Sequence, residues 1–397
     1  MGGALDDLLV LDLSRVLAGP YATQLLGDLG ARIIKVEQPG VGDETRAWGP
    51  PFTASGQSAY FIAANRNKES ITLNLKRPEA RAVLRELARR ADVLIENFKV
   101  GTLEAMGLGY NQLRAECPGL IYCSITGYGQ DGPYARRPGY DTVIQAQGGL
   151  MSVTGPADGE PSKVGIAVTD ITAGLYAATS ILAALHHRAR TGEGQQIDIA
   201  LFDVQLSWLA NVGSAYLVAG RPPKRYGNAH PTIVPYQPFP AADGNVMVAV
   251  GNDGQFARFC EVLGRPEWAT DPRYATNPAR VANREQLIPA IAAITATRPV
   301  AHWVEALLAA DVPCGPVNDI PAALAEPQTA ARAMVQEVQD SAGERLRLIG
   351  PAPKLSATPA RIRSAPPRLG EHTEAVLREL LGYDEERIAA LRAAGAI

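Results

Sequence analysis

Several hallmarks of nucleic-acid-binding, secreted and membrane proteins are missing from this chain of 397 residues. The formal net charge is only −3 and no block of like charge stands out, so nucleic acid is not an expected partner. No run approaches the roughly 20 apolar residues of a membrane span, and the start carries two acids in place of a basic leader. The four cysteines form no CxxC pair, and no histidine stands at metal spacing. We expect a cytoplasmic protein with reduced thiols, without a bound metal and without a membrane partner.

The order of the predicted elements is typical of an α/β protein. Helical segments such as 78–91, with proline in its first turn, fall between successive strands. Strands that alternate with helices favour a parallel sheet covered by helices. A longer helix is predicted over about 171–188. The apolar runs that predict strands lie at residues 8–13, 32–37, 70–75, 93–98 and 119–129, of which the last runs into a loop.

Two changes of composition divide the chain. From about residue 221 a stretch rich in proline and glycine reads as a linker, and a second proline-rich stretch begins near residue 331. Because 397 residues exceed the usual size of one domain, we predict two compact units. The changes of composition divide the chain into residues 1–220, 221–330 and 331–397.

The first strand–helix–strand unit does not carry the motif of a known nucleotide site. Its loop reads S-R-V-L-A-G-P, which lacks the GxGxxG glycines that bring the backbone close to a pyrophosphate. The chain also lacks a GxxxxGK[ST] loop, so a phosphate cradle for ATP is not expected. The sequence therefore favours neither a nicotinamide enzyme nor an ATP-driven ligase.

Five segments together resemble the family III CoA-transferases, and the resemblance extends over nearly the whole chain. The closer likeness is to the branch that transfers CoA between succinyl-CoA and dicarboxylates such as glutarate, and residues 226–239 and 312–319 carry it. The five segments are residues 15–46, 65–76, 93–110, 125–155 and 164–203.

The resemblance implies both a fold and a reaction. The fold is a large domain with a Rossmann-like parallel sheet and a nucleophile, and a smaller α/β domain with a glycine loop. The C-terminal segment returns to the large domain, and open-ring subunits interlock as a homodimer. The reaction moves CoA from an acyl-CoA donor such as succinyl-CoA to a free carboxylic acid, through an aspartyl anhydride and an aspartyl-CoA thioester. Acyl-CoA and small carboxylic acids are the implied partners, with CoA as part of the substrate and no permanently bound cofactor.

Asp170 stands where a strand-like segment meets the long helix. Taken alone, it fits a helix cap, and the helix dipole would keep its carboxylate ionised, as a nucleophile must be. The resemblance places the nucleophilic aspartate of the family at this residue. It also places a glycine loop that covers the intermediate at 250–255, with Gly251 and Gly254 giving the loop the φ freedom of a lid. A plain strand-to-helix turn is the alternative for this loop.

The resemblance further assigns residues to CoA. Arginine and lysine suit its phosphates, although any one of them alone is more often a solvated surface charge. Gln38 and Ala105 stand where some relatives carry arginines. The detailed contacts to CoA are therefore expected to differ from those of these relatives, but CoA is still the expected ligand. The assigned residues are Arg15, Val16, Gln38, Leu73, Lys76, Asn97, Phe98, Lys99, Arg137 (or its neighbour Arg136), Tyr140 and Asp141.

The second carboxylate of a dicarboxylate would require a cation or hydrogen-bond donors. Arg46, Arg225 and His230 are the candidates, and a structural role in the linker is the alternative for His230.

Two other functions stay open at this point. α-Methylacyl-CoA racemases use a related scaffold with a G-H-D sequence, where this chain has Gly139-Tyr140-Asp141. A tyrosine with a pKa of about 10 is a poor base near neutrality. A catalytically silent CoA-binding protein is the other alternative, and the presence of Asp170 together with the glycine loop argues against it.

Overall fold

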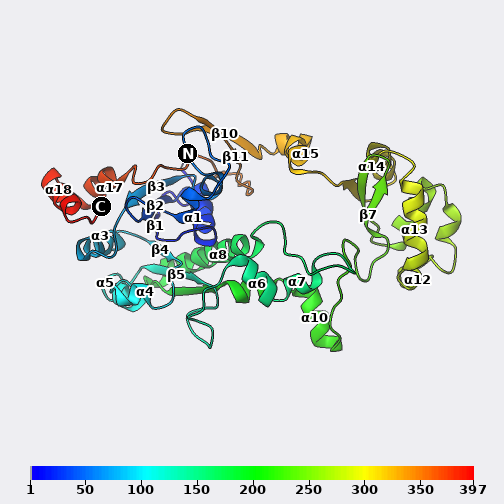
Figure 1. Cartoon of the computed structure of the whole chain (residues 1–397), viewed down its shortest axis with the longest axis horizontal. Coiled ribbons are helices and arrows are strands. Elements are labelled where there is room, and N and C mark those ends of the chain that lie inside the picture. The colour runs from blue at the N-terminus through cyan, green and yellow to red at the C-terminus, as the bar shows by residue number, and fades with distance from the viewer. Residues whose placement is uncertain (1) are drawn as a thin grey trace. The chain divides into compact units, whose positions relative to one another are not determined.

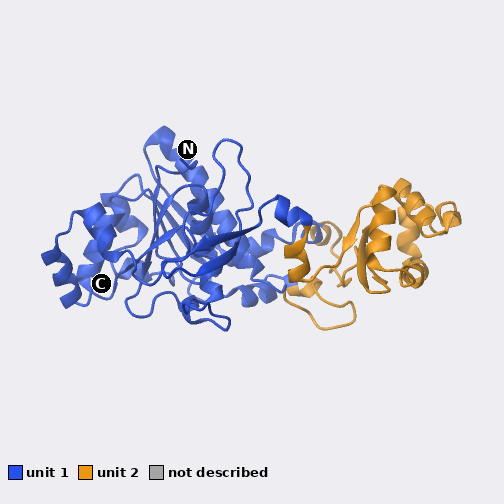
Figure 2. Ribbon diagram, turned by 90° about the horizontal axis from the view of Figure 1, so that it is seen from above, with its two compact units in different colours: residues 1–150, 164–214, 327–397 blue, residues 151–163, 215–326 orange. Residues whose placement is uncertain are grey.

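The computed structural model describes residues 2–397, which divide into two compact units (Figure 2). Unit 1 comprises residues 1–150, 164–214 and 327–397, and unit 2 comprises residues 151–163 and 215–326. The chain therefore ends in the unit in which it began. Two of the crossings lie close to the changes of composition near residues 221 and 331, whereas no such signal marks the short segment 151–163.

Unit 1 is built on a six-stranded sheet whose strands all run parallel (Figure 1). The predicted parallel α/β sheet is therefore confirmed. The strand order is β3-β2-β1-β4-β5-β6, so the direction of winding reverses between β1 and β4. In sheets of this kind the carboxyl ends of the strands form a crevice at that reversal. The strands are β1 (Leu9–Asp12), β2 (Arg32–Glu37), β3 (Lys68–Thr72), β4 (Val93–Glu96), β5 (Ile121–Thr126) and β6 (Gln196–Ala200).

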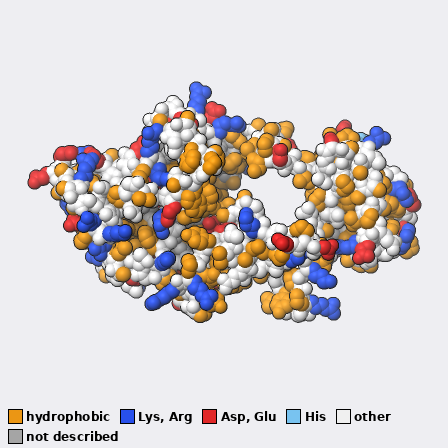
Figure 3. Space-filling view, viewed as in Figure 1, with side chains coloured by type: hydrophobic (Ala, Val, Ile, Leu, Met, Phe, Trp, Pro, Cys, Tyr) orange, Lys and Arg blue, Asp and Glu red, His pale blue; other side chains and the backbone are white. Residues whose placement is uncertain are grey.

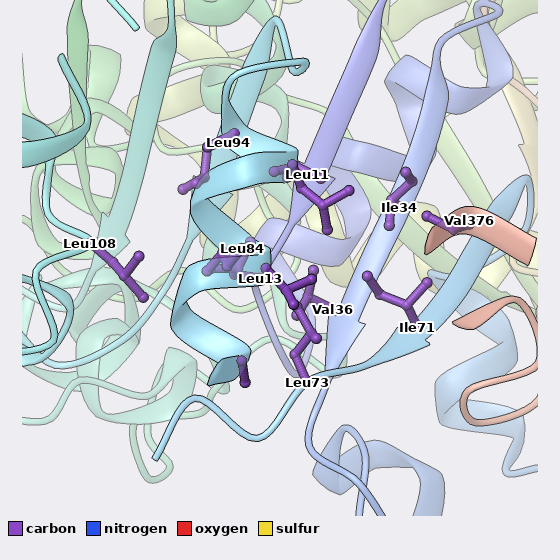
Figure 4. Close-up of a cluster of buried hydrophobic side chains, with 14 of the residues drawn as sticks. Leu11, Leu13, Ile34, Val36, Ile71, Leu73, Leu84, Leu94, Leu108 and Val376 are labelled. Atoms are coloured by element: carbon purple, nitrogen blue, oxygen red, sulfur yellow. The ribbon is translucent and has the colours of Figure 1, made fainter. Parts of the chain in front are cut away.

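Both faces of this sheet are covered, which explains why its strands read as continuous apolar runs. Leu11 and Ile34 point into one buried cluster together with helix α3 (Pro78–Ala88) (Figure 4). Their neighbours Val10 and Ile33 point into a second cluster on the opposite face. The two C-terminal helices, α17 (Thr373–Leu381) and α18 (Glu385–Ala393), both contribute to the first cluster.

The second face is covered by α1 (Ala18–Asp28) and the long helix α8 (Val168–Thr191). By length and a mean hydropathy of 1.4, α8 could cross a membrane, although no run of this kind was expected from the sequence. Its Ala177 and Ile181 are instead fully buried in the core of unit 1. A β-carbon on Gly174 would lie 2.7 Å from the Ala18 carbonyl, so glycine permits close packing against α1. The small apolar residues of α8 thus fit its place as a core helix.

Two shorter sheets complete the fold. In unit 2 the antiparallel strands β7 (Tyr236–Ala241), β8 (Gly244–Ala249) and β9 (Cys314–Pro316) pack against helices that include α11 (Asp253–Val262). In unit 1 the hairpin of β10 (Val335–Gln339) and β11 (Arg345–Ile349) occupies part of the proline-rich C-terminal stretch. That hairpin was not predicted. The remaining helices and 3-10 turns, in chain order, are η1 (Glu44–Ala47), α2 (Ala59–Ala63), α4 (Thr102–Ala105), α5 (Tyr110–Glu116), α6 (Asp141–Gln147), α7 (Leu150–Val153), α9 (Leu201–Ser207), α10 (Ala210–Ala219), η2 (Pro266–Ala269), α12 (Asn277–Ala282), α13 (Arg284–Thr295), α14 (Val300–Ala309), α15 (Ile320–Ala325) and α16 (Pro327–Ala331).

Candidate active site

A cavity of about 180 Å³ opens at the carboxyl edge of the parallel sheet in unit 1. Its walls come from the loops that follow β1, β4 and β5 and from the first turn of α8. This is the edge at which the strand order reverses, where ligands bind in sheets of this kind. The lining includes Asp170 and the predicted CoA residues Arg15, Val16, Asn97, Phe98, Lys99, Arg137 and Tyr140, together with Arg136.

Asp170 lies in the first turn of α8 and not at its N-cap, which is Ala167. The strand-like segment predicted before this helix is not a strand, because residues 164–167 form a loop. The role of helix cap belongs to Asp141, the first residue of α6. Its Oδ2 accepts hydrogen bonds from the main-chain amides of Thr169 at 2.8 Å and Asp170 at 3.2 Å. Asp141 was predicted to contact CoA, but its side chain is buried, only 7% exposed, and turned to α8.

The electrostatic surroundings of Asp170 differ from the prediction. Burial and, to a smaller extent, the negative charge of Asp141 together raise the pKa of its carboxyl to about 7. The expectation that the helix dipole keeps Asp170 ionised is therefore wrong. A second carboxylate already occupies the amides that would have stabilised its charge. Near pH 7 the group is divided between its neutral and charged forms.

The main chain at Arg15 and Val16 is held in an unusual conformation at the cavity wall. Val16 has a φ of 69°, which is a strained value for a β-branched residue. Asn97 fixes Arg15 by accepting from its amide at 2.9 Å and donating to its carbonyl at 2.7 Å. The Val16 amide donates to the carboxylate of Asp43, at 3.2 Å from each oxygen. Polar side chains thus hold this strained loop at the wall of the cavity.

A second cavity of about 130 Å³ adjoins the first, and Arg15 and Phe98 line both. The Arg15 guanidinium lies over the Phe98 ring, 5.5 Å from its centre. The predicted residues Gln38, Leu73 and Lys76 line this second cavity. Every predicted CoA residue except Asp141 therefore lines one of the two cavities, although these residues come from separate parts of the sequence.

Beneath the cavities lies a network of buried ion pairs that was not predicted. Lys68 Nζ lies 3.0 Å from Asp12 Oδ2, and Lys35 Nζ lies 2.9 Å from Asp43 Oδ2, with all four side chains fully buried. The two lysines lower the pKa of Asp12 to about 2, although burial alone would raise it. Burial lowers the pKa of Lys68 to about 8 against the pull of Asp12. The signal in the sequence was a lysine inside or at the start of an apolar strand, because such a charge requires a partner.

The three residues predicted to bind the second carboxylate are placed differently. Arg46 makes two 2.7 Å hydrogen bonds to the Glu37 carboxylate, and its guanidinium carbon lies 3.7 Å from the Phe61 ring centre. Arg225, in unit 2, donates to main-chain carbonyls, the shortest at 2.7 Å to Gly159. His230, also in unit 2, accepts from the Thr232 amide at Nδ1, which leaves Nε2 for a ligand.

The predicted glycine loop joins β8 to α11 in unit 2. Asn252 caps α11 through the amide of Gln255 at 2.9 Å, and Gln255 Oε1 accepts from the Gly251 amide at 2.7 Å. Gly254 lies in the first turn of α11. Both glycines are exposed and lie outside the left-handed φ region, so the conformation of this loop does not require glycine. Within residues 2–397 no group of three His, Cys, Asp or Glu side chains is placed to hold a metal ion.

The chain is similar to known proteins over nearly its whole length. Residues 5–373 match the model of CoA-transferase family III. The chain is 49% identical to the succinate–glutarate CoA-transferase of Agrobacterium fabrum, over 95% of each chain. It is 43% identical to the human succinyl-CoA:glutarate CoA-transferase, over 99% of this chain and 90% of that one. Among solved structures, a CaiB/BaiF family protein from Brucella suis superposes with a TM-score of 0.87 at 47% identity, covering 96% of this chain and all of the other.

Proposed function

The chain belongs to the family III CoA-transferases, and we propose that it moves CoA from succinyl-CoA to a dicarboxylate such as glutarate. The observation that carries this proposal is a carboxylate, Asp170, in a cavity whose other walls bear the cations Arg15, Lys99, Arg136 and Arg137. Cations suit the phosphates of CoA, and a carboxylate close to the bound thioester is the nucleophile that such transfer requires.

In the proposed reaction the Asp170 carboxylate attacks the thioester carbonyl of succinyl-CoA. The carbon–sulfur bond breaks, CoA leaves as a thiolate, and a succinyl–aspartyl anhydride forms. The thiolate then attacks the aspartyl carbonyl, which releases succinate and leaves CoA as a thioester on Asp170. The acceptor carboxylate repeats the two steps in reverse, so one activated carboxyl replaces another and ATP is not consumed.

The preference for a dicarboxylate rests on the names of the similar transferases and on a cation for the distal carboxylate. Arg46 is fully engaged by Glu37, and Arg225 by main-chain carbonyls. His230 has a free ring nitrogen, so we favour it among the predicted residues. The covering role of Gly251 and Gly254 stays a prediction.

The proposal is tested by incubating the enzyme with succinyl-CoA alone and then with a panel of acids. Succinate should be released without an acceptor, and CoA should be found on the tryptic peptide 164–188, which contains Asp170. Asp170→Ala should lose both the labelled peptide and transfer, by at least about a thousandfold. Asp131→Asn, an exposed aspartate of the same unit, is the control and should transfer normally. An Asp170→Ala variant that still transfers CoA, or a CoA label on another peptide, would contradict the proposal.

We also propose that the protein is a homodimer. Every residue of α10 is at least partly exposed, and Leu217 and Val218 are 83% and 89% exposed. Hydrophobic side chains gather over this helix (Figure 3), and a second copy of the chain is a natural cover for them. Light scattering should give twice the mass of the chain, and Leu217→Lys should lower that mass. The cytoplasmic location stays a prediction.

A further inference from the structure

The carboxylate of Asp141 is fixed at the start of α8 by contacts on both oxygens. Oδ2 accepts from the amides of Thr169 and Asp170, and Oδ1 accepts from Gln145 Nε2 at 2.5 Å. Gln145 is itself fully buried, and its Oε1 accepts from the Val164 amide at 2.9 Å. The orientation of this carboxylate is therefore set by buried partners and not by solvent.

A neutral residue would serve as well to hold the helix. Asparagine has the same size as aspartate and caps helices about as effectively, because one oxygen acceptor is sufficient. A neutral cap would also leave the positive end of the helix dipole free to stabilise the charge of Asp170. An aspartate at this position instead adds a negative charge beside the nucleophile, which capping alone does not explain.

We propose that Asp141 is a positioning residue that holds the first turn of α8 and favours the acylation of Asp170 by repelling its negative charge. This inference rests on the proposed function. In both covalent intermediates Asp170 carries no charge, because the charge has left on the CoA thiolate and then on succinate. Acylation therefore relieves the repulsion between the two carboxylates.

Other groups also face this part of the molecule. The phenol of Tyr60 has a raised pKa, caused by burial and then by the charges of Asp170, Asp141 and Asp43. The cavity beside Asp170 further contains the cations Arg15, Lys99, Arg136 and Arg137 and the carboxylate of Glu44. The burial and the neighbouring charge that raise the pKa of Asp170 agree with the geometry of the contacts.

The test replaces Asp141 by asparagine, which keeps the size and one acceptor but removes the charge. The acid limb of kcat/KM against pH, which reports the ionisation of Asp170, should move about one unit lower. With succinyl-CoA alone at about pH 8, the equilibrium ratio of CoA-labelled to free enzyme should fall about tenfold, because one unit of pKa equals a factor of ten. An unmoved acid limb together with an unchanged ratio overturns the inference.

Gln145→Leu is the matched control, because it removes a buried partner of Asp141 but keeps the charge. Its rate should fall without any movement of the acid limb, as expected for loss of position alone. If Asp141→Asn does not fold, Asp141→Ser also removes the charge, and the same shift of the acid limb is expected. Asp170→Ala separates this inference from the proposed function: if that variant loses transfer while the Asp141 variants keep the acid limb of the parent, only this inference fails.

Discussion

Two groups of buried carboxylates lie in unit 1, and they differ in their partners. Asp12 and Asp43 face Lys68 and Lys35 in fully buried pairs, and the pKa of each carboxyl is lowered although both are buried. Asp170 faces another carboxylate, that of Asp141, and its pKa is raised to about 7. Burial opposes the charged form in both groups. The charge of the neighbouring side chain therefore decides whether a buried carboxylate has a structural role or is a reactive group.

The paired group has a mechanical role next to the reactive one. Lys35 Nζ donates to the Ser14 carbonyl at 2.9 Å, and its partner Asp43 accepts from the Val16 amide. These contacts hold the Arg15 loop at the wall of the cavity that contains Asp170. Compensated charges thus fix the geometry, while the uncompensated charge beside them is available for chemistry.

The largest expected effect comes from breaking a compensated pair. Lys68→Met leaves the carboxylate of Asp12 buried with its hydroxyl and amide partners but without its lysine. We expect the free energy of unfolding to fall by about 3–5 kcal/mol, as for other buried pairs that lose one partner. Urea denaturation measures it. Lys354→Met, which removes an exposed lysine of the same unit, should change it by less than about 0.5 kcal/mol. An equally small decrease in the free energy of unfolding for Lys68→Met would mean that the Lys68–Asp12 pair does not stabilise the fold.

Removing the uncompensated charge of Asp170 should instead raise the free energy of unfolding. The pKa of Asp170 is higher in the folded protein than the ordinary value of 3.8, so ionisation destabilises the folded state relative to the unfolded state. Asp170→Asn should therefore stabilise the protein by about 2 kcal/mol above pH 7, reduced from the full linkage value because the group is only partly buried. The gain should diminish as the pH falls from about 7 to about 4, since below both pKa values neither state is charged. Thermal unfolding at several pH values measures it, and a variant less stable than the parent at high pH contradicts the comparison.

The sequence predicted Asp170 as a reactive group, but it predicted neither the contact of Asp141 with α8 nor the buried ion pairs. Asp170 was predicted because the resemblance of the five segments places the nucleophilic aspartate of the family at this residue, and its cavity follows from loops at one edge of a parallel sheet. The contact of Asp141 with α8 joins residues 28 positions apart, and only the packing of α6 beside α8 determines it. The pairing of Lys68 with Asp12 spans 56 positions in the same way. The hairpin of β10 and β11 left a local signal, the alternation RLRLI at 345–349, which the neighbouring prolines obscured.

The smallest effect on stability is expected for the partly exposed pair of Arg46 and Glu37. The Arg46 side chain is partly exposed, and Glu37 keeps the Ser70 hydroxyl and the Asp43 amide as donors if the arginine is lost. Arg46→Met should therefore reduce the free energy of unfolding by about 1 kcal/mol, closer to a surface pair than to Lys68. If the ion pair with Glu37 keeps Arg46 from binding substrate, Arg46→Met should leave the ratio of the transfer rates for glutarate and acetate unchanged. His230→Ala should lower this ratio. A ratio that falls for Arg46→Met with unchanged stability would show that this arginine can leave Glu37 for the substrate, and that a compensated charge can also take part in recognition.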